Sequence, residues 1–209
     1  MNNKYVNRSK LSEAKFRELV RLFSMDLTAI QIAELTGLNR NTVNRYLKAL
    51  RERIAEYCDV VAPPVLSRST RLEDGKKDAD WIGLREHQKK VHAALLFKNE
   101  LEQLGIDGKY SANEKFIDNK QELPFDLIIH FNRNTRIYIT DRNGYKANPS
   151  KFKRVEGFWG FARSRLEKFK GLRASTQVLH LKECEFRYNV PKDQLYSSVL
   201  KMCRKKPLF

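Results

Sequence analysis

Six polar side chains lie close together between residues 40 and 48, and their types suit hydrogen bonding to DNA. They are Arg40, Asn41, Thr42, Asn44, Arg45 and Lys48. Arginine and asparagine can form paired hydrogen bonds with guanine and adenine edges, respectively, in the major groove. Lysine and threonine suit contacts with phosphates, which orient a protein on the duplex. This set therefore predicts recognition of double-stranded DNA.

Two helices joined by a tight turn would present these side chains on one outer face. Thr28 and Gln31 have the spacing of a capping box that opens a first helix. Gly37 suits the turn, because glycine adopts a positive φ at low cost, and Asn39 can cap a second helix. The inner face of that second helix is apolar, with Val43, Leu47 and Leu50. The pattern predicts a helix-turn-helix over residues 28–51; the alternative is a helical hairpin with a solvated polar face.

The formal net charge of the 209-residue chain is +16, and it is unevenly distributed. Residues 1–62 carry a net +4, residues 63–140 a net +1 and residues 141–209 a net +11. Positive charge of this size attracts polyanions, most commonly nucleic acid and less often anionic membrane. The last third therefore predicts a second nucleic-acid surface, with a merely solvated basic face as the alternative. Its candidate phosphate-binding residues are Arg154, Arg163, Arg165, Lys168 and Lys170.

The three cysteines, Cys58, Cys184 and Cys203, are widely spaced and form no CxxC pair. This pattern supports neither a zinc knuckle nor a disulfide framework, and it is typical of reduced thiols in the cytoplasm. The first ten residues lack the apolar core of a secretion signal. No apolar run approaches the roughly 20 residues of a membrane span. We therefore expect a soluble, cytoplasmic protein with no membrane partner.

Hydrophobic periodicity predicts an α+β fold that is mainly helical and has three segments. Residues 1–62 form the helix-turn-helix domain, and residues 83–209 form a small mixed domain with a β-hairpin and C-terminal helices. Between them, residues 63–82 begin with two prolines, carry many charges and have no periodicity. They are typical of a linker.

Within the mixed domain we expect a helix over residues 84–104 that carries His87 and His92 as solvated polar residues. A β-hairpin follows, with strands over residues 125–131 and 136–140. Three further helices are predicted, over 155–169, over 175–188 and after Pro191.

Several stretches carry a more specific signal. Residues 16–20 are FRELV, residues 32–43 are IAELTGLNRNTV, residues 155–162 are VEGFWGFA followed by LEKFKG, and residues 180–189 are HLKECEFRYN. In this order they resemble the DNA-binding region, the last catalytic helix and the closing signature of bacterial insertion-sequence transposases of the ISXO-like group. The resemblance covers somewhat more than half of the chain. It implies binding to insertion-element DNA ends and the ability to form a homo-oligomer.

Such transposases have an RNase-H-like catalytic domain, in which three acidic residues hold two divalent metal ions for attack on a phosphodiester. The resemblance therefore implies metal-dependent DNA strand transfer with Mg²⁺ or Mn²⁺. Glu156 matches the last acidic position, and Asp141 resembles the second, so both are candidate metal ligands. Asp126 is the candidate for the first catalytic position, with Asp107 as a weaker one.

The middle third departs from the family pattern. Only 15 residues separate Asp141 from Glu156, and Lys153 stands where some members have a metal-binding asparagine. Two predicted strands are too few for an RNase-H-like sheet, so we expect a shortened or rearranged catalytic core. Asp126 and Asp141 are then alternatively a strand-edge and a turn carboxylate. Two other functions stay open: a DNA-binding repressor or remnant without catalysis, and a stand-alone nuclease.

Overall fold

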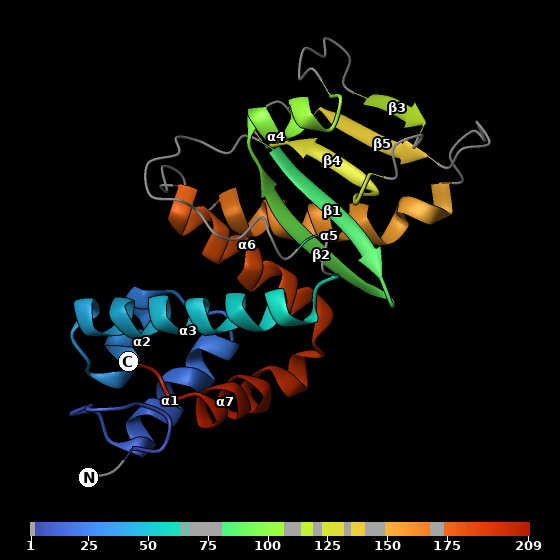
Figure 1. Cartoon of the computed structure of the whole chain (residues 1–209). Coiled ribbons are helices and arrows are strands. Elements are labelled where there is room, and N and C mark those ends of the chain that lie inside the picture. The colour runs from blue at the N-terminus through green and yellow to red at the C-terminus, as the bar shows by residue number, and fades with distance from the viewer. Residues whose placement is uncertain are drawn as a thin grey trace. The chain divides into compact units, whose positions relative to one another are not determined.

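The structure is a computed structural model of the whole chain, and it describes residues 3–63, 66, 81–106, 114–118, 123–131, 135–140, 149–167 and 174–209. In these ranges the fold is α+β and mainly helical, which confirms the predicted class (Figure 1). The chain forms two compact units. Unit 1 comprises Met1–Cys58 together with Asn189–Phe209, and unit 2 comprises Asp59–Tyr188.

Unit 1 is helical. Its helices are α1 (Glu13–Ser24), α2 (Ala29–Thr36), most of α3 (Arg40–Val61) and α7 (Leu195–Lys205), which follows a short 3-10 turn at Lys192–Gln194. Ser12 caps α1 by accepting a hydrogen bond from Lys15 N at 3.2 Å. One face of α1 is buried, as its helical spacing predicts, and it consists of Phe16, Leu19, Val20 and Phe23.

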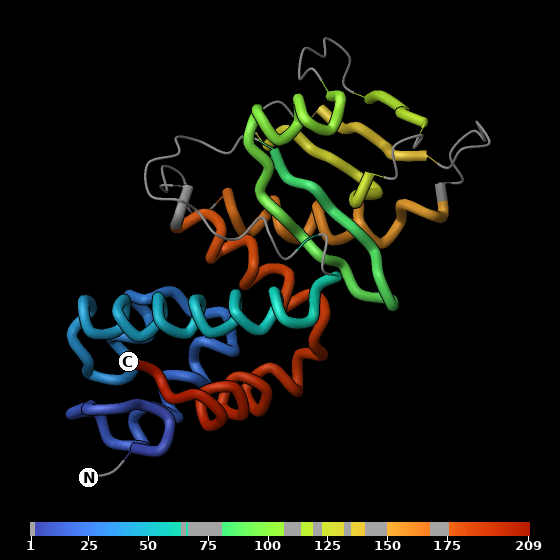
Figure 2. The backbone as a smooth tube through the Cα atoms, viewed as in Figure 1, coloured from blue at the N-terminus to red at the C-terminus, as the bar shows by residue number. Residues whose placement is uncertain are grey.

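The two ends of the chain both belong to unit 1 (Figure 2). Leu208 N donates to Tyr5 O, and Asn7 N donates to Leu208 O, each at 2.9 Å. Leu208 itself is buried. The predicted segment 83–209 therefore divides, because residues 189–209 belong to the same compact unit as the N-terminal helices.

Unit 2 is built on a five-stranded mixed sheet. Its strands are β1 (Trp81–His87), β2 (Lys90–Leu96), β3 (Glu114–Asp118), β4 (Leu127–His130) and β5 (Arg136–Thr140). Their order across the sheet is β2-β1-β4-β5-β3. The β3–β5 pair is parallel and the other pairs are antiparallel.

Apolar side chains cover both faces of this sheet. On one face, a cluster that includes Leu84 and Tyr138 packs against α5 (Pro149–Leu166) and α6 (Ala174–Asn189). On the other face, a second cluster that includes Ile128 contains Leu101 of the short helix α4 (Lys98–Gln103). The sheet is therefore the middle layer of unit 2 (Figure 1).

The predicted helix over residues 84–104 is wrong. Most of this range forms the β1–β2 hairpin, in which His87 pairs with Lys90, and only its last part is helical, in α4. Gln88 and Lys89 make the turn with φ values of 49° and 62°. His87 is exposed at the end of β1, but His92 is buried on β2 and is not the solvated residue that we expected.

Other predicted elements lie close to observed ones. Strands β4 and β5 occupy the two predicted strand ranges and pair antiparallel, with Leu127 opposite Tyr138. Helices α5, α6 and α7 occupy the three predicted C-terminal positions. Residues 132–134, between the two strands, and most of the predicted linker lie outside the described residues. Strand β3 has no counterpart in the sequence prediction.

Candidate nucleic-acid interface

Helix α2 begins with the predicted capping box and ends at the predicted glycine. Thr28 Oγ1 accepts a hydrogen bond from Gln31 N at 3.3 Å, and Gln31 Oε1 accepts one from Thr28 N at 2.9 Å. Gly37 follows the helix with a φ of 67°. A Cβ atom at Gly37 would meet nothing within 4 Å. Glycine is therefore favoured here by backbone conformation and not by lack of space.

Helix α3 begins at a second cap. Asn39 Oδ1 accepts a hydrogen bond from Asn41 N at 2.8 Å, which satisfies a donor in the first helical turn. The helix then buries Val43, Leu47 and Leu50, which confirms the predicted inner face. Because residues three or four apart share a helix face, this burial turns the intervening polar residues outward.

The outward face of the first turns of α3 carries the six residues singled out by their chemistry. Five are exposed and Thr42 is half-buried; the exposed ones are Arg40, Asn41, Asn44, Arg45 and Lys48. Between Glu34 and Glu52 the chain has four Lys or Arg residues and no Asp or Glu. Lys48 Nζ lies 3.8 Å from Glu52 Oε1, in a pair that is largely exposed and hence weak. The face is therefore basic and rich in side-chain amides.

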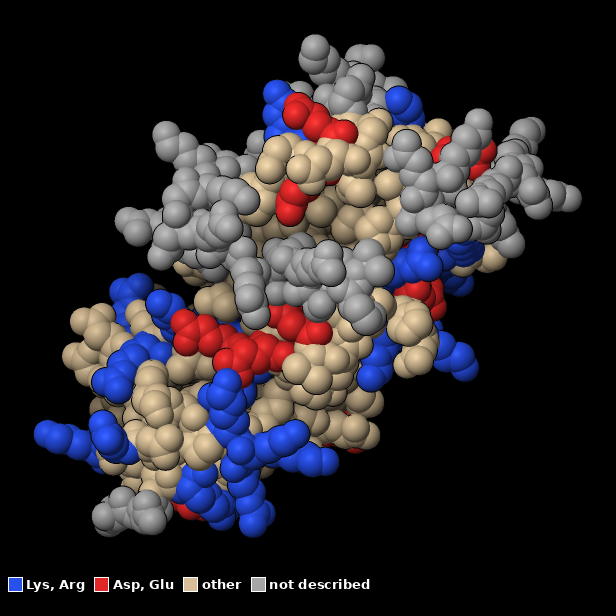
Figure 3. Space-filling model, in the orientation of Figure 1, with Lys and Arg blue, Asp and Glu red and all other residues tan. Residues whose placement is uncertain are grey.

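Positive charge is concentrated in unit 1. Its sequence has 16 Lys and Arg residues against 7 Asp and Glu, a net +9, whereas the larger unit 2 has 25 against 18, a net +7. Part of the +11 of the last third therefore belongs with the N-terminal helices, through residues of α7 and the tail that follows it. In the view of Figure 3, Lys and Arg side chains gather over the helices of unit 1.

The predicted basic surface on α5 is less available than its composition indicates. Arg154 Nε lies 3.0 Å from Glu86 Oε1, and Arg163 Nε lies 3.0 Å from Glu167 Oε1. The Arg165 side chain is only 11% exposed and its Nη2 atom lies 3.0 Å from Glu183 Oε1. A buried, paired guanidinium cannot serve as an open phosphate contact, so we leave Arg165 out of the interface. Two more candidates, Lys168 and Lys170, lie outside the described residues.

Asp126, the candidate first catalytic carboxylate, is bound within the sheet. Its Oδ1 accepts a hydrogen bond from Arg85 Nη1 at 3.0 Å, and its Oδ2 accepts one from Glu86 N at 2.7 Å. The side chain is 11% exposed. It directly precedes β4, and its bond to a backbone N–H of β1 extends the contact between these two strands. These contacts fit the strand-edge alternative considered for this residue.

Glu156, the candidate last catalytic carboxylate, lies on α5 beside strand β5. Its Oε1 accepts a hydrogen bond from Tyr138 Oη at 2.7 Å and lies 3.9 Å from Arg136 Nη1. Burial of the phenol, together with its bond to Glu156, raises the pKa of Tyr138. The phenol therefore stays protonated and donates across the neutral pH range. Asp141 and Asp107 lie outside the described residues.

The contacts of Asp126 are with protein groups. Mg²⁺ is bound through carboxylate oxygens, and both oxygens of Asp126 accept hydrogen bonds, one from a guanidinium and one from a backbone N–H. Across the described part of the chain, no three His, Cys, Asp or Glu side chains are grouped so that they could hold a metal ion. The contacts of Asp126 and Glu156 thus serve the packing of unit 2.

Comparisons with known proteins add no identification. No family model, no curated protein and no solved structure matches this chain. None of the helices in the described ranges has the length and apolar character needed to cross a membrane.

Sequence reasoning missed one contact at the candidate interface. The guanidinium carbon of Arg45 lies 4.3 Å from the centre of the Phe209 ring, and that ring meets Tyr46 edge-on with centres 5.5 Å apart. Arg45 and Phe209 are far apart in the sequence, and no local pattern connects them. Only the packing of the C-terminal tail in unit 1 brings them together.

Proposed function

We propose that this protein binds double-stranded DNA through a helix-turn-helix made of α2 and α3, with α3 as the recognition helix. One observation carries the proposal: the first turns of α3 bury Val43, Leu47 and Leu50 and expose the basic, amide-rich face opposite them. Residues 40–48 extend about 12 Å along the helix. An α-helix with its side chains is about 10–12 Å across, so it fits the roughly 12 Å width of the major groove of B-DNA.

The chemistry of the exposed residues assigns them two roles. Arg40, Asn41, Asn44 and Arg45 suit hydrogen bonds to base edges, and this is the contribution that distinguishes one sequence from another. Thr42 and Lys48 suit phosphate contacts, which set the orientation of the helix. The net +9 of unit 1 favours the same partner, because a duplex is a dense polyanion.

The resemblance to insertion-sequence transposases supports insertion-element ends as the target. It also implies strand transfer, but the contacts of Asp126 and Glu156 favour the alternative without catalysis. We therefore propose a transposase-derived DNA-binding protein that recognises such ends. Arg154 and Arg163, which are half-exposed, are proposed as secondary phosphate contacts.

Selection of DNA by the full-length protein tests this proposal. Duplexes that the wild type retains from a random-sequence library would be labelled, and their dissociation constants measured by fluorescence anisotropy over a range of salt concentrations. Asn44→Ala should weaken binding to the selected duplex by about 1–3 kcal/mol and relax the preference at one position. Lys48→Ala should weaken binding to all duplexes and lower the salt slope by about 1.

Lys98→Ala is the matched control, because it removes a similarly exposed lysine from α4 in unit 2. It should leave the affinity for the selected duplex unchanged. Failure of the wild type to enrich any sequence, or equal effects of Asn44→Ala and Lys98→Ala, would contradict the proposed recognition helix.

A cleavage assay separates binding from catalysis. The selected duplex, and a duplex carrying insertion-element terminal repeats, would be incubated with the protein in Mg²⁺ or Mn²⁺. We expect binding without cleavage or joining of strands. Strand cleavage that disappears in Asp141→Ala would instead establish a metal-dependent nuclease or transposase.

A further inference from the structure

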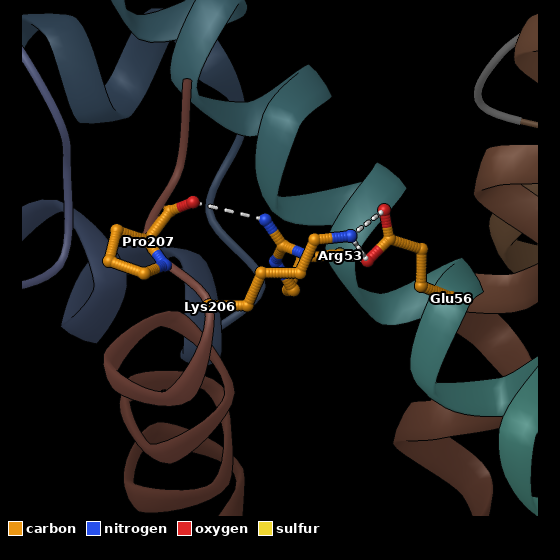
Figure 4. A network of polar contacts seen from close by, with 4 residues as sticks. All are labelled: Arg53, Glu56, Lys206 and Pro207. Carbon is orange, nitrogen blue, oxygen red and sulfur yellow. Dashed lines mark hydrogen bonds and ion pairs between the residues drawn. The ribbon is translucent and has the colours of Figure 1, made fainter.

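The tail that follows α7, residues 206–209, lies along α3 and reaches its recognition face. At its start, Lys206 Nζ lies 2.9 Å from Glu56 Oε2, and Pro207 O accepts a hydrogen bond from Arg53 Nη2 at 3.1 Å (Figure 4). At its end, Phe209 contacts Tyr46 and Arg45. The tail thus runs antiparallel to α3, from its middle toward its first turns.

The N-terminal segment holds the other side of this tail. Leu208 exchanges two backbone hydrogen bonds with it, one with Tyr5 and one with Asn7. Asn7 also donates from Nδ2 to Phe209 O at 3.0 Å. The backbone of Phe209 is therefore held by its neighbours, although the residue remains 50% exposed. Because its backbone is held in place, the exposed Phe209 ring can restrict the motion of a flexible cationic side chain that packs on it.

We propose that Phe209 is a positioning residue that holds Arg45 in the orientation in which it reads DNA. This inference rests on the proposed function of α3. A free arginine side chain samples many rotamers, and it must lose them when it pairs with a base. The Phe209 ring attracts the guanidinium through its π face and restricts the side chain before DNA arrives. The tail is thereby part of the recognition surface, without itself supplying a base contact.

The arrangement of charges around the pair supports this role. The Phe209 ring carries no charge that would compete with DNA for Arg45, and the Phe209 O atom accepts a hydrogen bond from Asn7 Nδ2, so the guanidinium keeps its hydrogen-bond donors for an outside acceptor. A carboxylate in the same place would occupy those donors, as Glu167 does for Arg163. An aromatic partner is therefore suited to orient the arginine and leave it able to bind.

Three variants of the full chain test the proposal on the duplex that the wild type selects. Phe209→Leu removes the π face and keeps an apolar side chain, and it should weaken binding by about two- to fivefold, the usual range for an exposed cation–π contact. Phe209→Tyr should restore wild-type affinity. In an Arg45→Ala background, Phe209→Leu should cause no further loss, because the two residues act as one unit.

The matched control is Tyr196→Leu, which removes a ring 6.0 Å from the Arg21 guanidinium on α1, together with the hydrogen bond that Tyr196 Oη accepts from Arg17 Nε. It should not change affinity. A second readout separates positioning from general stability: repeated selection with Phe209→Leu should lose sequence preference only at the positions that Arg45→Ala also affects. A merely structural role would weaken binding to every duplex equally.

The outcomes distinguish this inference from the proposed function. If the wild type enriches no sequence, the proposed function fails and the inference fails with it. If the wild type enriches a sequence and Arg45→Ala weakens its binding, but Phe209→Leu does not, only the inference is overturned. Equal losses for Phe209→Leu and Phe209→Tyr would also overturn it, because tyrosine retains the π face.

Discussion

Replacing Glu185 with glutamine should strongly destabilise unit 2. Glu185 lies on α6 and accepts hydrogen bonds from Lys182 Nζ at 2.9 Å and from Ala93 N at 3.1 Å, and His92 Nδ1 lies 3.2 Å away. The side chains of Lys182 and Glu185 are 2% and 1% exposed. Lys182 Nζ also lies 3.4 Å from Asp59 Oδ1. The pair therefore joins α6 to β2 and to the end of α3 inside unit 2.

The magnitude follows from the burial of both charges. Glutamine can still accept from Ala93 N, but it leaves the Lys182 ammonium without its nearest counter-charge. Removal of one partner from a buried ion pair costs about 3–5 kcal/mol. A whole domain is stabilised by about 5–15 kcal/mol, so Glu185→Gln should remove a large part of the stability of unit 2.

Urea unfolding followed by tryptophan fluorescence measures this loss selectively, because both tryptophans, Trp81 and Trp159, belong to unit 2. The matched control is Glu102→Gln, which makes the same change in an exposed pair with Lys98 on α4. That control should cost less than about 1 kcal/mol. Lys182→Met added to Glu185→Gln should recover part of the loss, because it removes the buried ammonium that has lost its nearest counter-charge.

The loss of stability caused by Glu185→Gln should depend on pH in a defined direction. Burial alone would raise the pKa of Glu185, but Lys182 and the hydrogen bonds from His92 and Ala93 hold it below its ordinary value of 4.5. The stabilisation is therefore complete above pH 4.5 and is lost as the pH falls through the lower folded-state pKa. The difference in free energy of unfolding between wild type and Glu185→Gln should therefore become smaller at acid pH. Equal midpoints for Glu185→Gln and Glu102→Gln at pH 7 would refute the reasoning.

Two further predictions concern the interiors of the units. Burial raises the pKa of Cys184 to about 11 and that of Cys203 to about 12. At pH 8 about one in a thousand Cys184 thiols is then ionised. An aromatic disulfide reagent should therefore label the native protein far more slowly than the protein in urea. Equal labelling rates would contradict this prediction. A methyl group at Gly83 would overlap the Phe125 ring. Gly83→Ala should therefore lower the free energy of unfolding by about 1–3 kcal/mol in the tryptophan-monitored urea transition. An unchanged midpoint would show that the ring can move aside.

The sequence predicted the N-terminal helices well because their signals are local. A cap, a turn glycine and a 3.6-residue apolar repeat each act within a few residues. Thr28, Gly37 and Asn39 therefore take the roles that their types indicate. The same reasoning found the apolar face of α3 and, with it, the outward residues of the candidate interface.

The β1–β2 hairpin escaped prediction for two physical reasons. Its turn residues, Gln88 and Lys89, both adopt a positive φ, a conformation that hairpins normally reach with glycine or asparagine. Strand β2 is buried on both faces from Val91 to Leu96, so it lacks the alternation of a half-buried strand. A continuous apolar run of this kind cannot be distinguished from a buried helix by its period.

Contacts between distant parts of the chain could not be predicted from local pattern. Glu185 looks like an ordinary charge on a helix, and only the packing of unit 2 brings its carboxylate to His92 and Ala93 on β2. Likewise, no sequence pattern around Arg45 or Phe209 indicates that these two side chains are in contact. In both cases the partner is chosen by tertiary structure, which a single sequence does not display.

The contacts of Asp126 bear directly on whether the protein retains catalysis. A metal ion at Asp126 would have to displace the Arg85 guanidinium and the Glu86 amide, and Arg85 would then lie beside a divalent cation. Repulsion between the metal ion and the Arg85 guanidinium opposes metal binding at Asp126. The same Asp126 carboxylate bonds to β1 and so holds β1 against β4. Unit 1, in contrast, has its own core and its own caps, so loss of a metal centre in unit 2 would leave the proposed recognition helix intact. The proposed function, DNA binding without cleavage, is the one that these two arrangements support.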